Sequence, residues 1–251
     1  MARKFQSQDL SGQDFSGLDL IGADLSRCNL TGANLKGANL SGANLIFAQL
    51  IGANLSGADI QESNLRDANL QGADLSSAIL SGSMLVGARL GSANLKGAIL
   101  NRAMAATANL ENANLSGAHL VDVILTNADL RNADLSSANM TGADLTGAFM
   151  WKADLIRTTL LGATMRGANL TQTDLRGSHL TNAALIRATL LQANLTGADL
   201  VGANLRGADL SNASLTNANL RGADLTGANL TNTDLGQANL VEVIGFIPRG
   251  T

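Results

Sequence analysis

The chain has 251 residues and a formal net charge of −3, and 45% of its residues are hydrophobic while only 2% are aromatic. Its 17 Lys and Arg residues form no run or stripe, which argues against direct binding of nucleic acid. The N-terminus lacks the apolar run of a signal peptide, and no stretch approaches the roughly 18 apolar residues of a membrane span. We therefore expect a cytoplasmic protein that does not contact a membrane.

A five-residue repeat occupies nearly the whole chain. From Phe5 to Leu240 every fifth residue is large and apolar except Ala105, and 41 of these 48 positions hold Leu. The unit reads Ala-(Asp/Asn)-Leu-x-x, with Ser, Thr and Gly common at the two variable positions. Five residues advance an α-helix by about 500°, so no apolar stripe forms, and an odd period sends successive units to opposite faces of a flat strand. A chain that bends once per unit keeps Ala and Leu inside, which predicts a solenoid.

Unbroken tandem units such as Ala33-Asn34-Leu35-Lys36-Gly37 resemble the pentapeptide repeat family over residues 5 to 244. The resemblance implies an all-β fold, a right-handed quadrilateral (four-sided) β-helix with 20 residues per coil and about 12 coils. We expect one domain over residues 1–251, with an N-terminal cap at 1–8 and a C-terminal cap or tail at 241–251.

The Asp/Asn position supports a 20-residue coil. Between residues 9 and 239 this position departs from Asp or Asn 15 times. Grouped by place within a 20-residue coil, the departures number 5, 5, 4 and 1. Four sides of different character would produce such a distribution.

The first coil carries bulkier side chains than the rest of the array. Phe5 and Phe15 replace Leu, and Gln8, Gln13 and Leu18 replace the small interior residue. A β-helix exposes an apolar cross-section and unpaired strand edges at each end. We expect these side chains to close the N-terminal end.

Apolar departures at the outward-facing Asp/Asn position cluster on two adjacent predicted sides. They are the candidate partner interface: Ile79, Met84, Ile99, Met104 and Ile124. A cluster of this kind on a polar rod is typical of a contact site for a partner or a second copy. Two alternatives remain open: local repacking, in which Met104 swings inward to fill the gap at Ala105, and a surface with no contact role.

No residue pattern indicates catalysis, a cofactor or a metal site. His119 and His179 lie three predicted coils apart, and the glycines follow the repeat without forming a phosphate-binding loop. Asp134, Asp154 and Asp174 should stack on one side, where a cation or a partner's Lys or Arg could bind them. The alternative is that the nearby side chains of Arg131, Arg157 and Arg176 already compensate their charge. We expect a non-enzymatic protein.

The C-terminus leaves the repeat at Gly245. Phe246 and Ile247 are the candidate end-to-end contact, because they either fold across the last coil or meet the same residues of another copy. The family resemblance implies that end-to-end dimers of this kind occur.

Two functions follow from these observations. The first is a structural or protein-interaction scaffold that presents patterned side chains on a rigid rod. The second comes from the resemblance alone: some family members mimic DNA and bind DNA gyrase or topoisomerase IV, which they inhibit or protect from quinolones. A DNA mimic should concentrate negative charge, whereas this chain is nearly neutral. The scaffold is therefore the favoured hypothesis.

Overall fold

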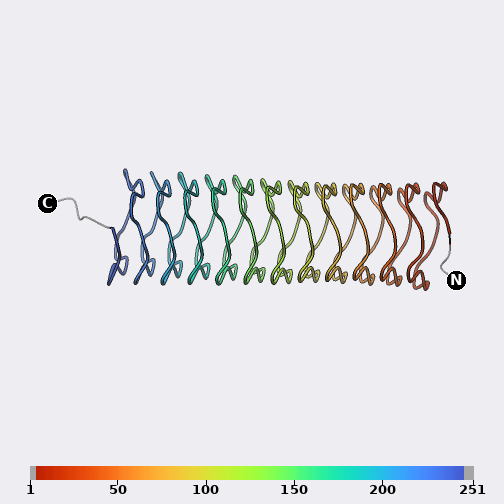
Figure 1. The fold of residues 1–251 in the computed structure, drawn as a ribbon, viewed down its shortest axis with the longest axis horizontal. Coiled ribbons are helices and arrows are strands. Elements are labelled where there is room, and N and C mark those ends of the chain that lie inside the picture. Colours follow the sequence, from red (N-terminus) through yellow and green to blue (C-terminus); the bar gives the residue numbers. More distant parts are fainter. Residues whose placement is uncertain (1–3, 246–251) are drawn as a thin grey trace.

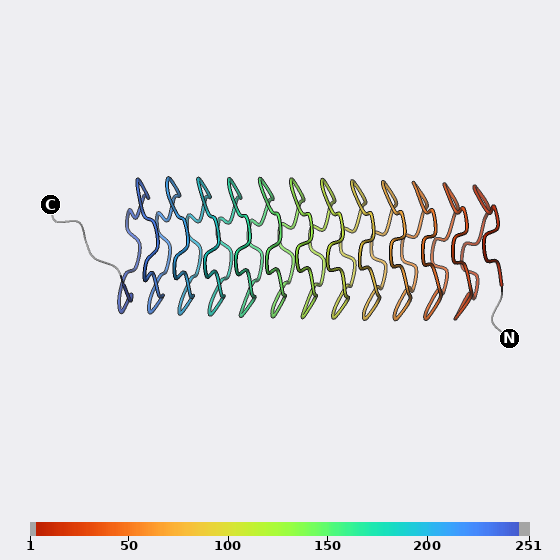
Figure 2. The ribbon, with the colours of Figure 1, turned by 45° about the horizontal axis from the view of Figure 1, so that its top comes forward.

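The computed structural model describes residues 4–245, and Phe246 and Ile247 lie outside this range. Figure 1 shows successive turns of the chain stacked along one long axis in sequence order. Figure 2 shows the same stack without a break along its length. The solenoid expected from the five-residue pattern is confirmed.

Parallel bridges join each Asp/Asn position to the position 20 residues later, from Lys4 with Asp24 through Asp224 with Ile244. Four five-residue units separate bridge partners, and each unit contains one bridge and one turn. Within residues 4–245 every β element is a single bridge residue, and none of these residues is helical. The 20-residue interval is thus present, while the right-handed sense and the number of coils stay predictions.

Three backbone hydrogen bonds per unit join neighbouring coils. In the unit that begins at Ala33, the Leu35 amide donates to Asn54 O (2.7 Å) and the Gly37 amide donates to Ser56 O (2.9 Å). The Asn54 amide donates in turn to Ala33 O (2.9 Å). The same pattern recurs along the rod, so each coil is held mainly by the coils on either side of it.

Each corner is a β-turn closed inside its own unit. The Ala38 amide donates to Leu35 O at 3.0 Å, which is the i to i+3 bond of a turn. The second variable position has positive φ, 63° at Gly37 and 58° at Thr107, as a type II turn requires at its third residue. Gly is common at this position because it adopts positive φ without steric cost.

The core consists of columns of Leu and Ala. Leu115 and Leu35 are completely buried, and the Ala position faces the same interior. Cys28 occupies an Ala position and is buried as expected, and its burial raises the pKa of the thiol. Burying each Leu contributes about 1.5 to 3 kcal/mol, so stability accumulates along the rod.

Ala105 stays in register at the centre of its coil and is only 1% exposed. Met104 is 36% exposed, and it bridges Met84 and Ile124 in the regular ladder. The alternative of local repacking, in which Met104 swings inward to fill the gap at Ala105, is therefore wrong. Continuous hydrogen bonding on both sides of the unit keeps the chain in register and the Met side chain outside.

At the N-terminal end Phe5 and Phe15 pack against the core, with their ring centroids 6.2 Å apart in an edge-to-face arrangement. Gln8, Gln13 and Leu18 are exposed there. The two aromatic side chains cover part of the first coil, and an N-terminal cap at residues 1–8 remains a prediction because residues 1–3 are not described.

Candidate interaction surface

The Asp/Asn side chain points outward and accepts a hydrogen bond from the backbone of the turn that follows it. Asn54 Oδ1 accepts from the Ser56 amide at 3.0 Å, an Asx-turn. Between residues 9 and 239 every Asp or Asn at this position accepts a hydrogen bond from the backbone amide two residues later. The four other amides of a unit donate to backbone carbonyls, so with this side chain all five backbone amides of the unit have a hydrogen-bond acceptor.

Hydroxyl and amide groups next to these carboxylates lower several Asp pKa values. The Ser211 hydroxyl donates to Asp209 Oδ1 at 2.7 Å and is the main reason that the pKa of Asp209 lies below its ordinary value of 3.8. The Thr226 hydroxyl lowers the pKa of Asp224 in the same way. The charged carboxylate is the stronger acceptor, so the corner favours the ionised form.

An apolar side chain at the Asp/Asn position removes this acceptor. The backbone amides of Ser81, Val86, Asn101, Ala106 and Thr126 lose it, because Ile and Met have no hydrogen-bonding oxygen. At His119 the acceptor is replaced: the Val121 amide donates to Asn101 Oδ1 of the preceding coil at 3.0 Å. A hydrogen bond contributes a net stabilisation of about 0.5 to 1.5 kcal/mol. Each apolar residue at this position therefore makes its turn less stable than Asp or Asn would.

The predicted interface residues lie in two neighbouring columns of the rod, and we call them the apolar patch: Ile79, Met84, Ile99, Met104 and Ile124. Bridges join Ile79 to Ile99 on one side of the rod, and they join Met84 to Met104 and Met104 to Ile124 on the next side. Bridge partners on adjacent coils lie about 4.8 Å apart. Ile124 is 40% exposed and Met104 is 36% exposed, while the other three are half-buried.

A groove of about 450 Å³ runs along the corner between the two sides of the apolar patch. Val121 and Ser81 line it together with an ion pair between Arg102 and Asp122, 4.0 Å apart. Both charged side chains are mostly exposed, so this pair contributes little to stability. The patch therefore combines apolar side chains with a polar, hollowed corner.

The two histidines and the Asp column do not converge. His119 and His179 are exposed and are separated by three bridge steps along one column. Asp134, Asp154 and Asp174 are stacked by bridges as expected. Within residues 4–245 no three His, Cys, Asp or Glu side chains are grouped to hold a metal ion.

The charge compensation expected for the Asp column is only partly present. Arg176 pairs with Asp174 at 2.7 Å. Arg131 instead pairs with Asp129 at 2.6 Å and with Glu111 at 3.3 Å, so its expected role beside Asp134 is wrong. The reason is register: Arg131 follows Asp129 by two residues at the same corner, and its guanidinium reaches that carboxylate first.

The C-terminal coil is less covered than the coils before it. Leu230, Leu235 and Leu240 are half-buried, whereas interior Leu side chains are fully buried. Val241 and Ile244 are 56% and 57% exposed. The candidate end-to-end contact of Phe246 and Ile247 lies outside the described residues and remains a prediction.

Nowhere in the described part of the chain is there a helix long and apolar enough to cross a bilayer. The expected cytoplasmic location remains a prediction.

Comparison with known proteins identifies the repeat. The family described as "Pentapeptide repeats" matches in eight copies, over residues 5–32, 28–67, 63–102, 108–147, 138–177, 173–212 and 203–240. No match was found among curated proteins.

Two solved structures illustrate the likeness. HetL, a pentapeptide repeat protein involved in heterocyst differentiation regulation from the cyanobacterium Nostoc sp., is 38% identical with a TM-score of 0.58, and the match covers 86% of this chain and 89% of HetL. QnrB1, a plasmid-mediated fluoroquinolone resistance protein, is 18% identical with a TM-score of 0.44, and the match covers 96% of this chain and 92% of QnrB1. Because the repeat matches extend from residue 5 to residue 240, this chain belongs to the pentapeptide repeat family.

Proposed function

We propose that this protein is a non-enzymatic interaction scaffold that binds a protein partner through the apolar patch. The observation that carries the proposal is the loss of the corner acceptor at five neighbouring positions. Asp or Asn would stabilise each of these corners, and the apolar side chains there remain partly exposed. The acceptor is also missing at other positions, such as Thr159, but in the patch its loss coincides with five neighbouring, partly exposed apolar side chains. A stability cost combined with exposed apolar side chains is typical of a binding site, where fit to a partner outweighs local stability.

The likeness to HetL supports a regulatory role carried out through protein contacts. HetL is described as involved in the regulation of differentiation, and it matches most of this chain. A right-handed rod of about 12 coils would present the apolar patch near its middle at fixed spacing. A partner with an apolar contact surface and a polar rim would complement the patch and its corner groove.

The test restores the repeat consensus at the two most exposed patch residues. Met104→Asn and Ile124→Asn together supply acceptors for the Ala106 and Thr126 amides, so thermal stability should be unchanged or higher. Binding should fall sharply, because two apolar contacts become polar. Sedimentation velocity measures self-association, and affinity capture from the protein's own cell extract measures partner binding.

Thr159→Asn is the matched control, because it restores the same acceptor for Leu161 on a coil outside the patch. If the double variant and the control bind a second copy or partner as well as the unchanged protein, the patch is not the interface. A double variant that binds less only because it unfolds would show a lower melting temperature than the control.

The DNA-mimic hypothesis, with DNA gyrase or topoisomerase IV as the partner, remains a prediction from the family resemblance. A supercoiling assay with added protein tests it directly. Inhibition of supercoiling, or protection of gyrase from a quinolone, would favour the DNA-mimic hypothesis over the scaffold hypothesis if the effect persisted in the Met104→Asn, Ile124→Asn variant.

A further inference from the structure

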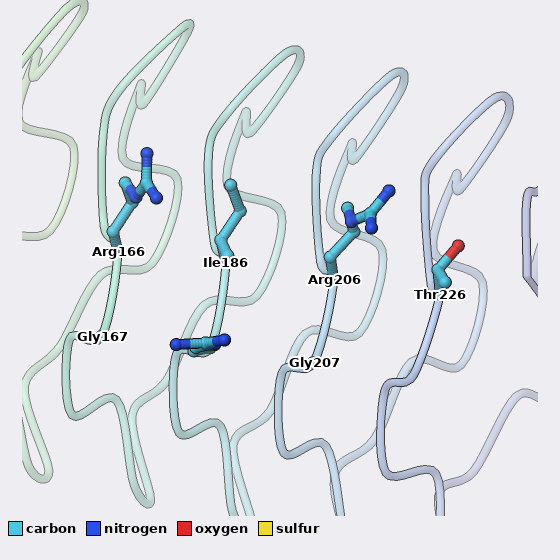
Figure 3. Close-up of a pocket in the computed structure, with 7 residues that line it drawn as sticks. Arg166, Gly167, Ile186, Arg206, Gly207 and Thr226 are labelled. Carbon is cyan, nitrogen blue, oxygen red and sulfur yellow. The ribbon is translucent and has the colours of Figure 1, made fainter.

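Three arginines from three successive coils line a hollow at one corner of the rod. Arg166 and Arg206 occupy the same turn position two coils apart, and Figure 3 shows their side chains on either side of Ile186. Arg187 occupies the neighbouring turn position on the coil between them. The hollow has a volume of about 550 Å³.

Glycines create the space beside Arg187. Gly167 and Gly207 occupy the same turn position on the coils before and after Arg187, so no side chain stands at that position on either neighbouring coil. A Cβ added at Gly167 would meet nothing within 4 Å, and one added at Gly207 would lie 3.5 Å from Arg187 Cγ. The turns are stacked by hydrogen bonds from the Gly167 amide to Ile186 O (3.0 Å) and from the Arg187 amide to Arg206 O (2.9 Å). The backbone around the hollow therefore keeps the regular inter-coil hydrogen bonds.

The positive charge at this corner is mostly uncompensated. Arg206 Nη1 lies 3.5 Å from Asp224 Oδ2, while among residues 4–245 neither Arg166 nor Arg187 takes part in an ion pair. The Asp/Asn positions that precede this corner on the three coils are occupied by uncharged residues: Thr164, Ala184 and Asn204.

We propose that this corner binds a small molecule that carries two or more linked phosphate groups. A guanidinium presents a planar fork of donors that matches phosphate oxygens in pairs. The backbones of Arg166 and Arg206 lie two coils apart, about 10 Å, with Arg187 between them, so three forks are spread over a length that exceeds one phosphate group. This inference is independent of the apolar patch, which lies on other coils.

A nucleic acid fits the corner less well than a small polyphosphate. The same turn position carries Thr146 on the coil before Arg166 and Thr226 on the coil after Arg206, so the basic stretch ends after three coils. Nucleic-acid surfaces need an extended row of phosphate contacts, and single strands also need aromatic side chains for base stacking. The hollow is lined by Arg, Gly, Ile and Thr residues only.

Titration calorimetry with inorganic tripolyphosphate tests the proposal. The key variant is Arg187→Gly, which removes the central guanidinium and places Gly at a backbone φ of 55°, so the fold should be retained. The matched control is Arg157→Gly, which removes one exposed Arg at the same φ of 55° on another corner. We expect binding to weaken about tenfold or more in Arg187→Gly and to stay unchanged in the control.

Orthophosphate and a duplex oligonucleotide are the comparison ligands, all measured at physiological ionic strength. Weaker binding of both than of tripolyphosphate supports the proposal. The proposal is overturned if tripolyphosphate does not bind at about 1 mM, if the two variants weaken binding equally, or if the duplex binds more tightly.

Discussion

Each residue of the unit has a separate structural task. Leu fills the centre, Ala allows the coils to close around it, and the Asp/Asn side chain caps the corner amide. The two variable residues form the turn, and the second of them must adopt positive φ. Single substitutions should therefore have effects that depend on the position within the unit rather than on the place along the rod.

Leu115 tests the central position. It is completely buried, so Leu115→Ala should lower the free energy of unfolding by about 2 to 5 kcal/mol, and Leu115→Asp should cost more because it buries an unpaired carboxylate. Chemical denaturation followed by circular dichroism measures both. An Asp variant as stable as the unchanged protein would contradict an inward-facing Leu.

The turn position can be tested in both directions. Thr107 is β-branched at a φ of 58°, so Thr107→Gly should stabilise by about 1 kcal/mol. Gly117 has a φ of 65° with open space around it, so Gly117→Ala should destabilise through backbone strain alone. Melting temperatures that shift in the same direction for both variants would rule out strain as the cause.

At the scale of the coil, the corners are joined by hydrogen bonds to charged or amide side chains. Asn29 Nδ2, for example, donates to Asp9 Oδ1 on the preceding coil at 2.9 Å, besides the Asx-turn that each side chain forms. Several carboxylates at these corners, among them Asp24, Asp209 and Asp224, have pKa values below the ordinary 3.8, and the largest contribution at Asp209 is the Ser211 hydroxyl. Acid should therefore weaken the corners of many coils together.

The direction of the pH effect follows from the lowered pKa of Asp209, Asp224 and Asp24. A group whose folded pKa is depressed binds protons more weakly in the folded state, so its stabilisation is present above 3.8 and is lost as pH falls below that value. Urea midpoints should be level near neutral pH and should decrease below 3.8. Asp209→Asn keeps an acceptor oxygen without a titrating group, so its midpoint should fall less.

At the scale of the whole molecule, contacts between neighbouring coils dominate. Every bridge spans 20 residues, and the ladder continues from Lys4 to Ile244 without a break. Such a rod gains stability with each added coil and tolerates the loss of one coil if the register is kept. Length and register, rather than a central globular core, determine whether it folds.

Deletion of residues 126–145 tests this property. It removes one 20-residue coil and joins Leu125 to Thr146, which preserves the five-residue pattern. The product should fold with a smaller urea m-value, because less surface is exposed on unfolding. Deletion of 126–147 is the control, since it joins Leu125 directly to Ala148 and removes the turn residues between them. Equal stability of the two products would contradict a requirement for register.

The sequence alone determined the solenoid and the inward Leu and Ala, because these depend on local preferences repeated every five residues. The 20-residue coil followed from the family resemblance, and the distribution of departures from Asp and Asn supported it. It also placed the apolar patch on two adjacent sides, and the bridges between Ile79 and Ile99 and between Met84 and Met104 agree. A strict period makes such neighbours calculable without coordinates.

Only the tertiary structure decided which side chains meet across coils. The capping role of Asp and Asn does not follow from the five-residue pattern, because it depends on the turn geometry that leaves one amide of each unit without a backbone carbonyl. Arg131 pairs with Asp129 and Glu111 instead of the Asp column, and Arg166, Arg187 and Arg206, which form no run in the sequence, line one hollow. The 20-residue register could have aligned these three arginines, but ion pairing and open space depend on side-chain direction. The physical reason is that the five-residue pattern fixes the path of the backbone, whereas ion pairing and surface shape depend on side-chain direction. That direction is decided both within a corner, as for Arg131 and Asp129, and between coils that lie 20 residues apart along the chain.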